Sequence, residues 1–442
     1  MTFRAGPVSP ALIPESLCMK LSLLALILCL FPFVAMTSPL DSAEQAMQSG
    51  QTEKALALVH AYQPTDRAGS IRKLWVLGVA YNRLNRPRAA IAPLDRLVAL
   101  APAKADFRLE LALALLRAGQ SDRARYHFTL ASGAGLQPAL QARVQAEIDK
   151  IDTSKDWQGY LRFALVPESN AARRTAAETV SLGGLTFRLQ PGAQAQSAVG
   201  AELGFGLAAL PKLSDNLRAR LAFDVQGRTF DGRAPEDVTL RIGAGLLHFG
   251  DRGRQFSADV FAAHRWLDTS VYSRSHGIDL RHSRLVGAKT NVTTLFVHER
   301  LSYVQPSYDV NRTAISFQVS HIATPQIQLL AAARAERRHS ANQLAAGQAF
   351  GLSLGGQYSF SGGLRAGLML SYEHDSFVGV HPLFGVRRVD HKSAAMVQIN
   401  NQNWSHRGFS PVLKIGVERR RSSIVINSYQ NLTASIGLTR SF

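Results

Sequence analysis

Leu217-Arg-Ala-Arg-Leu-Ala-Phe-Asp-Val-Gln226 alternates between apolar side chains and mostly polar ones. Successive side chains of a β-strand point to opposite faces, so this stretch predicts a strand with one apolar face and one wet face. Residues 350–360 and 432–439 repeat the pattern, with apolar side chains set against Gly, Ser, Thr and Gln. Each stretch has about the length that crosses a bilayer at a tilt. The sequence therefore predicts a transmembrane antiparallel β-barrel over residues 178–442.

The connections between the predicted strands form a second pattern. Tight turns are expected at 250–253, 323–325 and 361–363. The stretches expected to be longer, polar loops are 229–238, 266–272, 303–311, 337–348, 376–391 and 421–431. Barrels of the outer membrane place short turns in the periplasm and longer loops outside. We therefore expect about 14 strands, an even number that returns both ends of the barrel to the periplasm. Residues 156–177 are expected to form a connector or a first barrel segment.

The residues before the barrel follow a helical pattern that contains an internal repeat. Five positions recur after 34 residues: Gly78, Tyr81, Ala90, Leu94 and Leu97 return as Ala112, Leu115, Ala124, Phe128 and Ala131. This is the period of tetratricopeptide repeats, in which small residues let paired helices approach closely. We expect residues 38–155 to form a periplasmic solenoid of such repeats, packed through Gly78, Tyr81, Ala90, Ala124, Phe128 and Ala131. The solenoid offers a concave face for a protein partner, and the alternative role is that of a spacer.

An apolar run from Leu21 to Ala35 follows Met19 and Lys20. It is shorter than the roughly 20 residues of a spanning helix and is typical of a signal peptide. We expect residues 1–37 to be that signal, with Met19 as the true start. The two cysteines, Cys18 and Cys29, lie before or within the run. The mature chain is therefore expected to hold no thiol, and neither a metal nor a cofactor is expected.

Charge and motif content argue against several classes of function. The net charge of +18 is scattered through alternating segments rather than gathered into a patch, so no nucleic-acid partner is expected. Adjacent residues on a strand point to opposite faces, so neither His282-Ser283 nor His339-Ser340 can act as a catalytic dyad. The chain has no phosphate-binding loop of the Walker type. The sequence thus predicts a protein that is not an enzyme.

Several short motifs together resemble a known family. The motifs are Trp157-x-Gly159-Tyr160, Pro167-Glu-Ser-Asn170, Arg407-Gly-Phe-Ser-Pro411, Glu418-Arg-Arg-Arg-Ser422, Tyr429-x-x-Asn431 and Arg440-x-Phe442. In this order they resemble the surface lipoprotein assembly modifiers, or Slam proteins. That family joins periplasmic tetratricopeptide repeats to a C-terminal barrel of fourteen strands. The repeat region of this chain is shorter than that of the larger members.

The resemblance implies an outer-membrane translocon that delivers surface lipoproteins, or related secreted host-ligand-binding proteins, from the periplasm to the cell surface. The residues it points to for client binding or translocation are Asn170, Arg407, Gly408, Phe409, Pro411, Tyr429 and Asn431. The expected partners are the client, the barrel assembly machinery, periplasmic chaperones, outer-membrane lipids and lipopolysaccharide. A polysaccharide export porin with tetratricopeptide repeats and a passive channel remain as alternatives. Residues 408–411 either weaken strand pairing at a gate or mark the start of a strand.

Gly437, Arg440 and Phe442 are expected to form the barrel-assembly signal, because a terminal Phe in the last strand is what the assembly machinery reads in outer-membrane proteins. Deleting Phe442 is expected to lower the amount of assembled barrel before it affects transport. The heat-dependent gel mobility of the protein in outer-membrane fractions measures this amount. A normal level of assembled barrel after the deletion would count against the expected topology.

Overall fold

The structure, a computed structural model, describes residues 38–442 except 233, 402–403, 407 and 442. The predicted signal peptide, Arg407 and Phe442 therefore lie outside the described residues. The chain divides into two compact units, Met1–Gln63 and Pro64–Phe442. Among the helices that the structure describes, none is both long enough and apolar enough to cross a membrane.

Helices and short connections make up the described chain from Pro39 to Ser154. In the first unit they are α2 (Pro39–Gln48) and α3 (Thr52–Ala61). In the second unit they are α4 (Arg67–Arg83), α5 (Pro87–Leu100), α6 (Ala105–Arg117), α7 (Ser121–Ala131) and α8 (Pro138–Ser154). Side-chain caps mark the starts of two of them: the Asp66 carboxylate accepts a hydrogen bond from the Gly69 amide at 2.6 Å before α4, and Ser38 Oγ accepts one from the Asp41 amide before α2.

The helices of the second unit pack around one apolar core, to which the repeated positions contribute. Ala90, Ala124 and Ala131 have no exposed surface, and Phe128 is buried with them. Gly78 is also buried, and Tyr81 is half-buried against the same core. Helix α4 packs on α5, α5 on α6, and α6 on α7. The small residues thus lie where helices meet, and the assignment of these helices to the tetratricopeptide class stays a prediction.

Gly78 gives the first testable prediction, because a Cβ added there would lie 2.4 Å from Leu94 Cδ2. Replacing Gly78 with valine should force α4 and α5 apart and cost about 1–3 kcal/mol of stability. Hydrogen exchange of the α4 and α5 amides in the full-length protein measures the change. Ala68→Val, at an exposed position of the same helix, is the matched control and should leave exchange unchanged. Equal exchange in both variants would contradict the packing described here.

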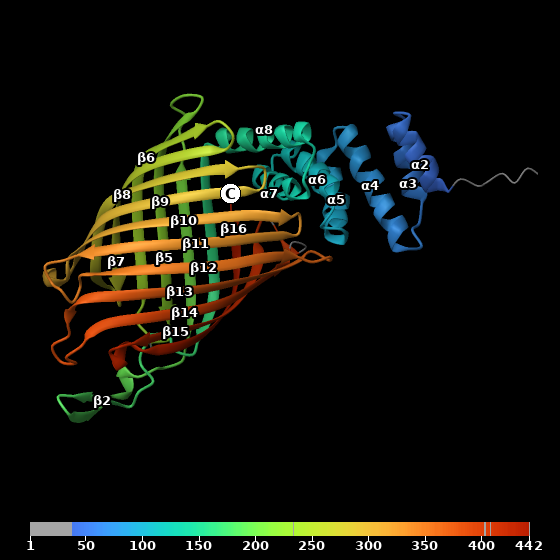
Figure 1. The fold of residues 1–442 in the computed structure, drawn as a ribbon. Helices are drawn as coiled ribbons and strands as arrows, with labels where there is room; N and C mark the ends of the chain where they lie inside the picture. The colour runs from blue at the N-terminus through green and yellow to red at the C-terminus, as the bar shows by residue number, and fades with distance from the viewer. Residues whose placement is uncertain (1–37, 233, 402–403, 407, 442) are drawn as a thin grey trace, which may run out of the picture. The chain divides into compact units, whose positions relative to one another are not determined.

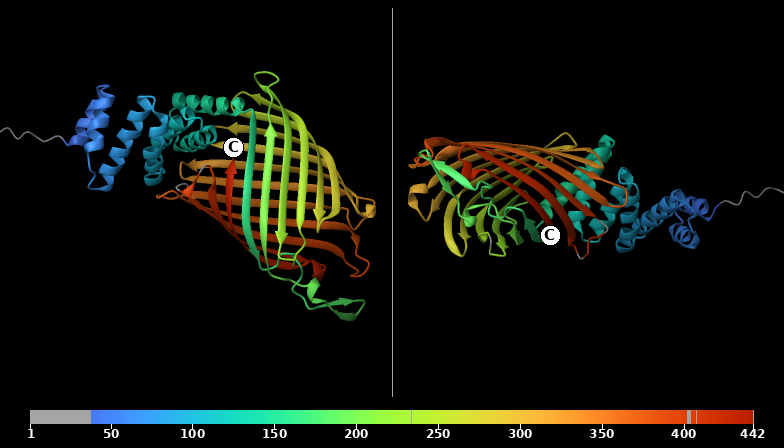
Figure 2. Two further views of the ribbon diagram at one scale, coloured as in Figure 1. Left: turned by 180° about the vertical axis from the view of Figure 1, so that it is seen from behind. Right: turned by 90° about the horizontal axis from the view of Figure 1, so that it is seen from below.

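A closed antiparallel barrel of 14 strands forms the rest of the second unit, with β1 paired to β16 (Figures 1 and 2). The first strands are β1 (Trp157–Glu168), β4 (Ala198–Ala209), β5 (Leu217–Phe230), β6 (Asp237–Gly250), β7 (Arg254–Leu267), β8 (Ser270–Val286) and β9 (Thr290–Tyr303). The remaining strands are β10 (Val310–Thr324), β11 (Ile327–His339), β12 (Gly347–Ser359), β13 (Leu364–Val380), β14 (Arg387–Asn401), β15 (Ser410–Ser422) and β16 (Tyr429–Ser441). The predicted fold class and strand number are confirmed.

Alternation along β5 shows how the sequence makes a barrel wall. Leu221 and Phe223 are exposed on the outside, where lipid would cover them. The residues between and beside them turn inward: Arg220 pairs with the Asp259 carboxylate at 2.9 Å, and Asp224 accepts a hydrogen bond from the Tyr160 hydroxyl. The wet face of the predicted strands therefore lines the lumen.

The barrel starts earlier than the sequence indicated. Strand β1 begins at Trp157 and belongs to the barrel, so residues 157–168 of the stretch expected to be a connector or a first segment form its first strand, and residues 169–177 belong to the connection after it. The alternating residues after 178 form β2 (Thr179–Leu182) and β3 (Leu185–Arg188), a separate hairpin outside the barrel. With four residues in each strand, this hairpin is too short to cross a bilayer.

Most connections follow the expected contrast between short and long ones. Short turns lie at 251–253, 325–326 and 360–363, and five of the six expected loops lie between strands, at 231–236, 304–309, 340–346, 381–386 and 423–428. The sixth differs. The predicted loop at 266–272 is a tight turn between β7 and β8, in which Asp268 and Thr269 both have positive φ. Such a two-residue turn matches the twist of paired strands, so β7 and β8 continue almost to its tip. The longest connection between two barrel strands is 169–197, which joins β1 to β4 at the end of the barrel away from the helices.

Contacts within the second unit hold its helices against one end of the barrel, which we call the helix end. Lys289, in the turn between β8 and β9, donates a hydrogen bond from Nζ to the Gly133 carbonyl at 2.8 Å. Gln255 of β7 donates to the Asp152 carboxylate of α8 at 3.2 Å. Arg218 of β5 is buried and pairs with Asp156, just before β1, at 3.1 Å. The opposite end, which carries residues 169–197, is the far end.

Candidate functional site

Glu168, the last residue of β1, lies at the centre of a polar cluster at the far end of the lumen. Its carboxylate has no exposed surface. The Arg228 guanidinium of β5 donates a hydrogen bond to Glu168 Oε1 at 3.0 Å, and the Asn431 amide of β16 donates one to Oε2 at 2.9 Å. A buried carboxylate is stable only when it is paired in this way. Glu168 therefore ties the first strand of the barrel to the last.

Residues Ser169 and Asn170 extend this tie into the connection that follows β1. The Asn170 amide N–H donates a hydrogen bond to Asn431 Oδ1 at 2.9 Å, and the Asn170 side chain donates one to the Gln430 carbonyl at 3.1 Å. Ser169 and Leu432 exchange two more hydrogen bonds, at 2.9 and 2.8 Å. We call Glu168, Ser169, Asn170 and Asn431 the latch.

Arg173, in the connection after β1, contacts side chains that line the lumen. Its guanidinium lies 3.2 Å from Glu418 of β15 and 3.9 Å from Glu168. Burial lowers the pKa of Arg173, but the two carboxylates raise it by more, so the pKa lies above its ordinary value. Glu418 also binds Lys392 at 2.9 Å and accepts a hydrogen bond from the Tyr429 hydroxyl. Residues 169–174 are thus held inside the barrel mouth by charge and hydrogen bonds.

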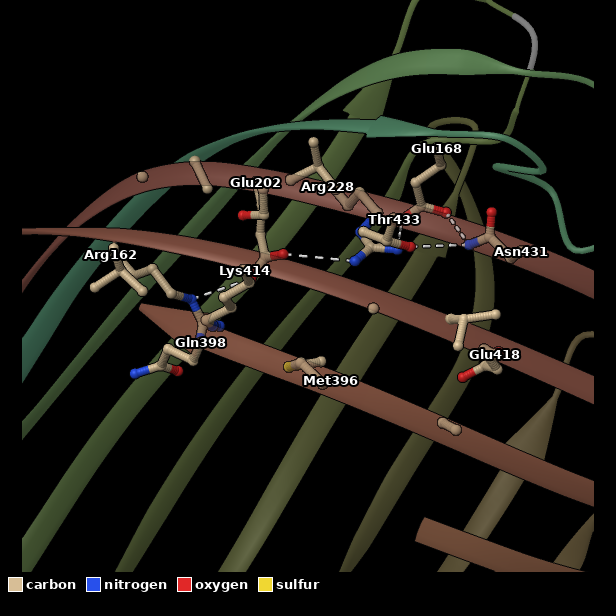
Figure 3. A pocket seen from close by; sticks show the side chains of 18 of the residues that line it. Arg162, Glu168, Glu202, Arg228, Met396, Gln398, Lys414, Glu418, Asn431 and Thr433 are labelled. Carbon is tan, nitrogen blue, oxygen red and sulfur yellow. Dashed lines mark hydrogen bonds and ion pairs between the residues drawn. The ribbon is translucent and has the colours of Figure 1, made fainter. Parts of the chain in front are cut away.

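A cavity of about 340 Å³ lies next to the latch on the lumenal side of β14, β15, β16, β1 and β4 (Figure 3). Two ion pairs link β1, β4 and β5 along its edge: Arg162 lies 3.0 Å from Glu202, and Glu202 lies 3.5 Å from Arg228. Met396, Gln398 and Lys414 line the opposite strands, as Figure 3 shows. The cavity is therefore charged on one side and mixed on the other.

The ladder between β1 and β16, which we call the seam, is interrupted beside this cavity. Residues 160–165 pair continuously with β16, and pairing resumes only at Glu168 with Thr433. Pro167 lies in the interruption and has no N–H to donate, whereas on its other side β1 pairs with β4 throughout. On the helix-end side of the gap, Gly437 lets β16 lie very close to β1, because a Cβ at this position would lie 2.4 Å from the Phe163 carbonyl oxygen.

The candidate residues predicted from the sequence fall into two groups. Asn170, Tyr429 and Asn431 come together at the far end, as described above. Gly408, Phe409 and Pro411 lie at the helix end, where the Arg440 guanidinium stacks 5.5 Å from the centre of the Phe409 ring. Gly408 has a positive φ and sits beside Arg440, and Arg407 lies outside the described residues.

Pro411 pairs with Leu438 in a ladder that runs on without a shift, so the structure places it at the start of a strand and shows no weakened pairing there. The weakened pairing lies at Pro167 instead. Sequence reasoning quoted this proline within a motif but did not single it out. Proline is normally confined to the edge strands of a sheet, because it cannot donate a ladder hydrogen bond. A proline within a strand predicted to pair on both sides could therefore have indicated Pro167.

No group of His, Cys, Asp and Glu side chains in the described ranges is arranged to hold a metal ion. The ionisable residues near the latch are engaged in ion pairs with each other, as the distances above show. What the arrangement provides is a set of bonds at one end of a wet lumen that join the first and last strands of the barrel.

Comparison with known proteins decides the family. A model of the family "surface lipoprotein assembly modifier" matches residues 157–442, which span the barrel from β1 to its end. The chain belongs to this family. For a surface lipoprotein assembly modifier, an outer-membrane location and a role of the barrel in lipoprotein surface assembly follow, as does a surface lipoprotein as client. The family thus indicates a transport barrel rather than an enzyme.

Solved structures give weaker similarities to this surface lipoprotein assembly modifier. One is a bacterial polysaccharide outer membrane secretin, at 14% identity and a TM-score of 0.37, covering 64% of this chain and 98% of the other. Another is the outer membrane channel DcaP of Acinetobacter baumannii, at 8% identity and a TM-score of 0.40, covering 65% and 96%. TM-scores this low carry no argument. No curated protein matches the chain.

Proposed function

We propose that this protein delivers surface lipoproteins, or related secreted ligand-binding proteins, from the periplasm to the cell surface, with the barrel as the path. The observation that carries the proposal is the family match over the entire barrel. The lumen supports it, because its lining of paired Arg, Glu and Asp side chains suits an unfolded, hydrated chain better than a compact apolar solute.

The proposed orientation places the helix end in the periplasm and the far end outside. The barrel begins with the first residue of β1 and ends with the last residue of β16, and both lie at the helix end. Bacterial barrels have an even number of strands with short turns on the periplasmic side, so we place this end in the periplasm. The helices of the second unit, at residues 67–154, then lie where a client arrives, and we propose that they engage it. In this orientation the latch lies at the outer mouth of the barrel. Barrel assembly machinery and periplasmic chaperones would act on this chain before transport, and lipopolysaccharide would surround its outer rim.

Co-expression in a heterologous Gram-negative host tests the proposal. Epitope-tagged candidate surface lipoproteins from neighbouring genes are produced with this protein, with an unrelated barrel, or alone, and intact cells are labelled with antibody. We expect at least one candidate to gain surface signal only with this protein. Equal surface signal under all three conditions, for every candidate, would contradict the proposal.

A further inference from the structure

The lumenal wall behind the seam carries several apolar side chains among its polar ones. The cavity there is lined by Ala164, Val166, Ala394, Met396 and Val412, which we call the apolar wall, with Ser435, Lys414 and Gln398 set between them. Gly416 and Gly437 of the same strands also line the cavity, and because they have no side chain they leave room beside the apolar residues. Met396 is 45% exposed, although it lies on the inner face of the barrel.

The apolar wall adjoins the interrupted part of the seam. Val166 belongs to the wall, and the next residue is Pro167, where the pairing of β1 with β16 fails. On the outside of the same strands, Leu165 and Ile436 are exposed to the surroundings of the barrel, where lipid would lie. Only the two ladder strands therefore separate an apolar lumenal surface from the membrane.

The seam can part at this point more readily than at its flanks. Towards the helix end, pairing is continuous from Tyr160 to Leu165. Towards the far end the strands are joined by the latch, in which all but one of the bonds described, that from the Ser169 amide to the Leu432 carbonyl, involve a side chain. Opening of the latch would extend the gap at Pro167 to the far end of the barrel.

We propose that the apolar wall and the seam form a lateral path for the acyl chains of a lipidated client, which leave the lumen between β1 and β16 while the polypeptide passes through it. The inference rests on the proposed function. Acyl chains in a wet lumen expose a large apolar area to water, so they need an apolar surface inside and an exit to the bilayer. The apolar wall supplies the surface inside the lumen, and the seam supplies the exit to the bilayer.

A disulfide across the seam tests the path. The described residues contain no cysteine, and Ser169 and Leu432 exchange two hydrogen bonds across the part of the seam that would open. The double variant Ser169→Cys/Leu432→Cys joins the end of β1 to β16 there. Leu165→Cys/Ile436→Cys joins the same two strands where the ladder is already continuous, and is the matched control. Both are assayed with a client that the wild-type protein displays and with the same client lacking its acylated cysteine.

We expect the seam lock to lower surface delivery of the acylated client at least tenfold and to leave release of the non-acylated client unchanged. A reductant should restore delivery, and the control lock should deliver both clients normally. The inference is overturned if the locked seam delivers the acylated client normally, or if it blocks both clients equally. Failure of the proposed function would look different, since the wild-type protein would then deliver neither client.

Direct contact is tested on the purified full-length protein with a photoreactive benzoylphenylalanine at position 396. The probe is a tripalmitoylated peptide, compared with the same peptide without acyl chains. We expect cross-linking of the acylated probe from position 396 and at least fivefold less from position 318. Gln318 is the matched control, because it is exposed on the lumenal face of β10, away from the seam. Equal labelling from both positions would contradict a specific acyl path.

Discussion

Replacing Gly437 with valine is expected to prevent closure of the barrel. A Cβ at this position would lie 2.4 Å from the Phe163 carbonyl oxygen and 2.7 Å from Ala164 Cβ. The first of these is a backbone atom, so no side-chain rotation relieves the clash, and β16 must move away from β1. Overpacking of this kind costs about 1–3 kcal/mol in a core and acts here on the ladder that closes the barrel.

We therefore expect at least a tenfold loss of folded barrel, measured as the heat-modifiable band in outer-membrane fractions. Gly351→Val is the matched control on a barrel strand, because its nearest neighbour would be the Tyr372 carbonyl oxygen at 3.7 Å, an ordinary contact distance. Folded barrel should persist in the control. A Gly437→Val protein that assembles as well as the control would show that β1 and β16 do not meet as described.

Replacing Asn431 with leucine is expected to open the latch. The substitution keeps the approximate size but removes both the donor to Glu168 and the acceptor for the Asn170 amide. The Asn170 amide and Glu168 Oε2 each lose a buried hydrogen bond, at a cost of about 1–3 kcal/mol for each, while Glu168 keeps its bond from Arg228. The far end of β16 should then separate from β1 far more often than in the wild-type protein.

Hydrogen exchange measures this opening directly. The Leu432 amide, which donates to Ser169 Oγ, should exchange at least tenfold faster in Asn431→Leu. Amides of the β10–β11 ladder, on a distant part of the barrel, should not change. Gln398→Leu alters the same cavity without touching the latch and is the control variant. Unchanged exchange at Leu432 would mean that the latch does not hold the seam.

The fold could be predicted from the sequence because each strand carries its own signal. The alternation in Leu217–Gln226 requires no knowledge of a partner, since one face must meet lipid and the other water. The start of the barrel could not be placed in the same way. Residues 157–168 and 179–188 both alternate, and only pairing with β4 and β16 separates a barrel strand from a projecting hairpin.

The site was only half accessible to sequence reasoning, for a related physical reason. Asn170, Tyr429 and Asn431 stood out by their resemblance to family motifs, and the structure brings them together. Glu168 bonds to Asn431 across 263 positions of sequence, so no local spacing reveals the pair. Residues 408–411 contain a proline that could weaken strand pairing, but the ladder there is intact. Pro167 interrupts a ladder only because the closed barrel pairs β1 with β16, and this pairing is not visible in the sequence.

The most direct test of the account follows a client through the barrel. A photoreactive residue is placed at Lys414, which lines the lumenal cavity, or at Ile415, which faces outward from the same strand. Cells that display an epitope-tagged surface lipoprotein are irradiated during its synthesis, and adducts with the client are counted. We expect client adducts from position 414 and at least tenfold fewer from position 415. Surface display of the client without adducts from position 414 would contradict passage through the barrel.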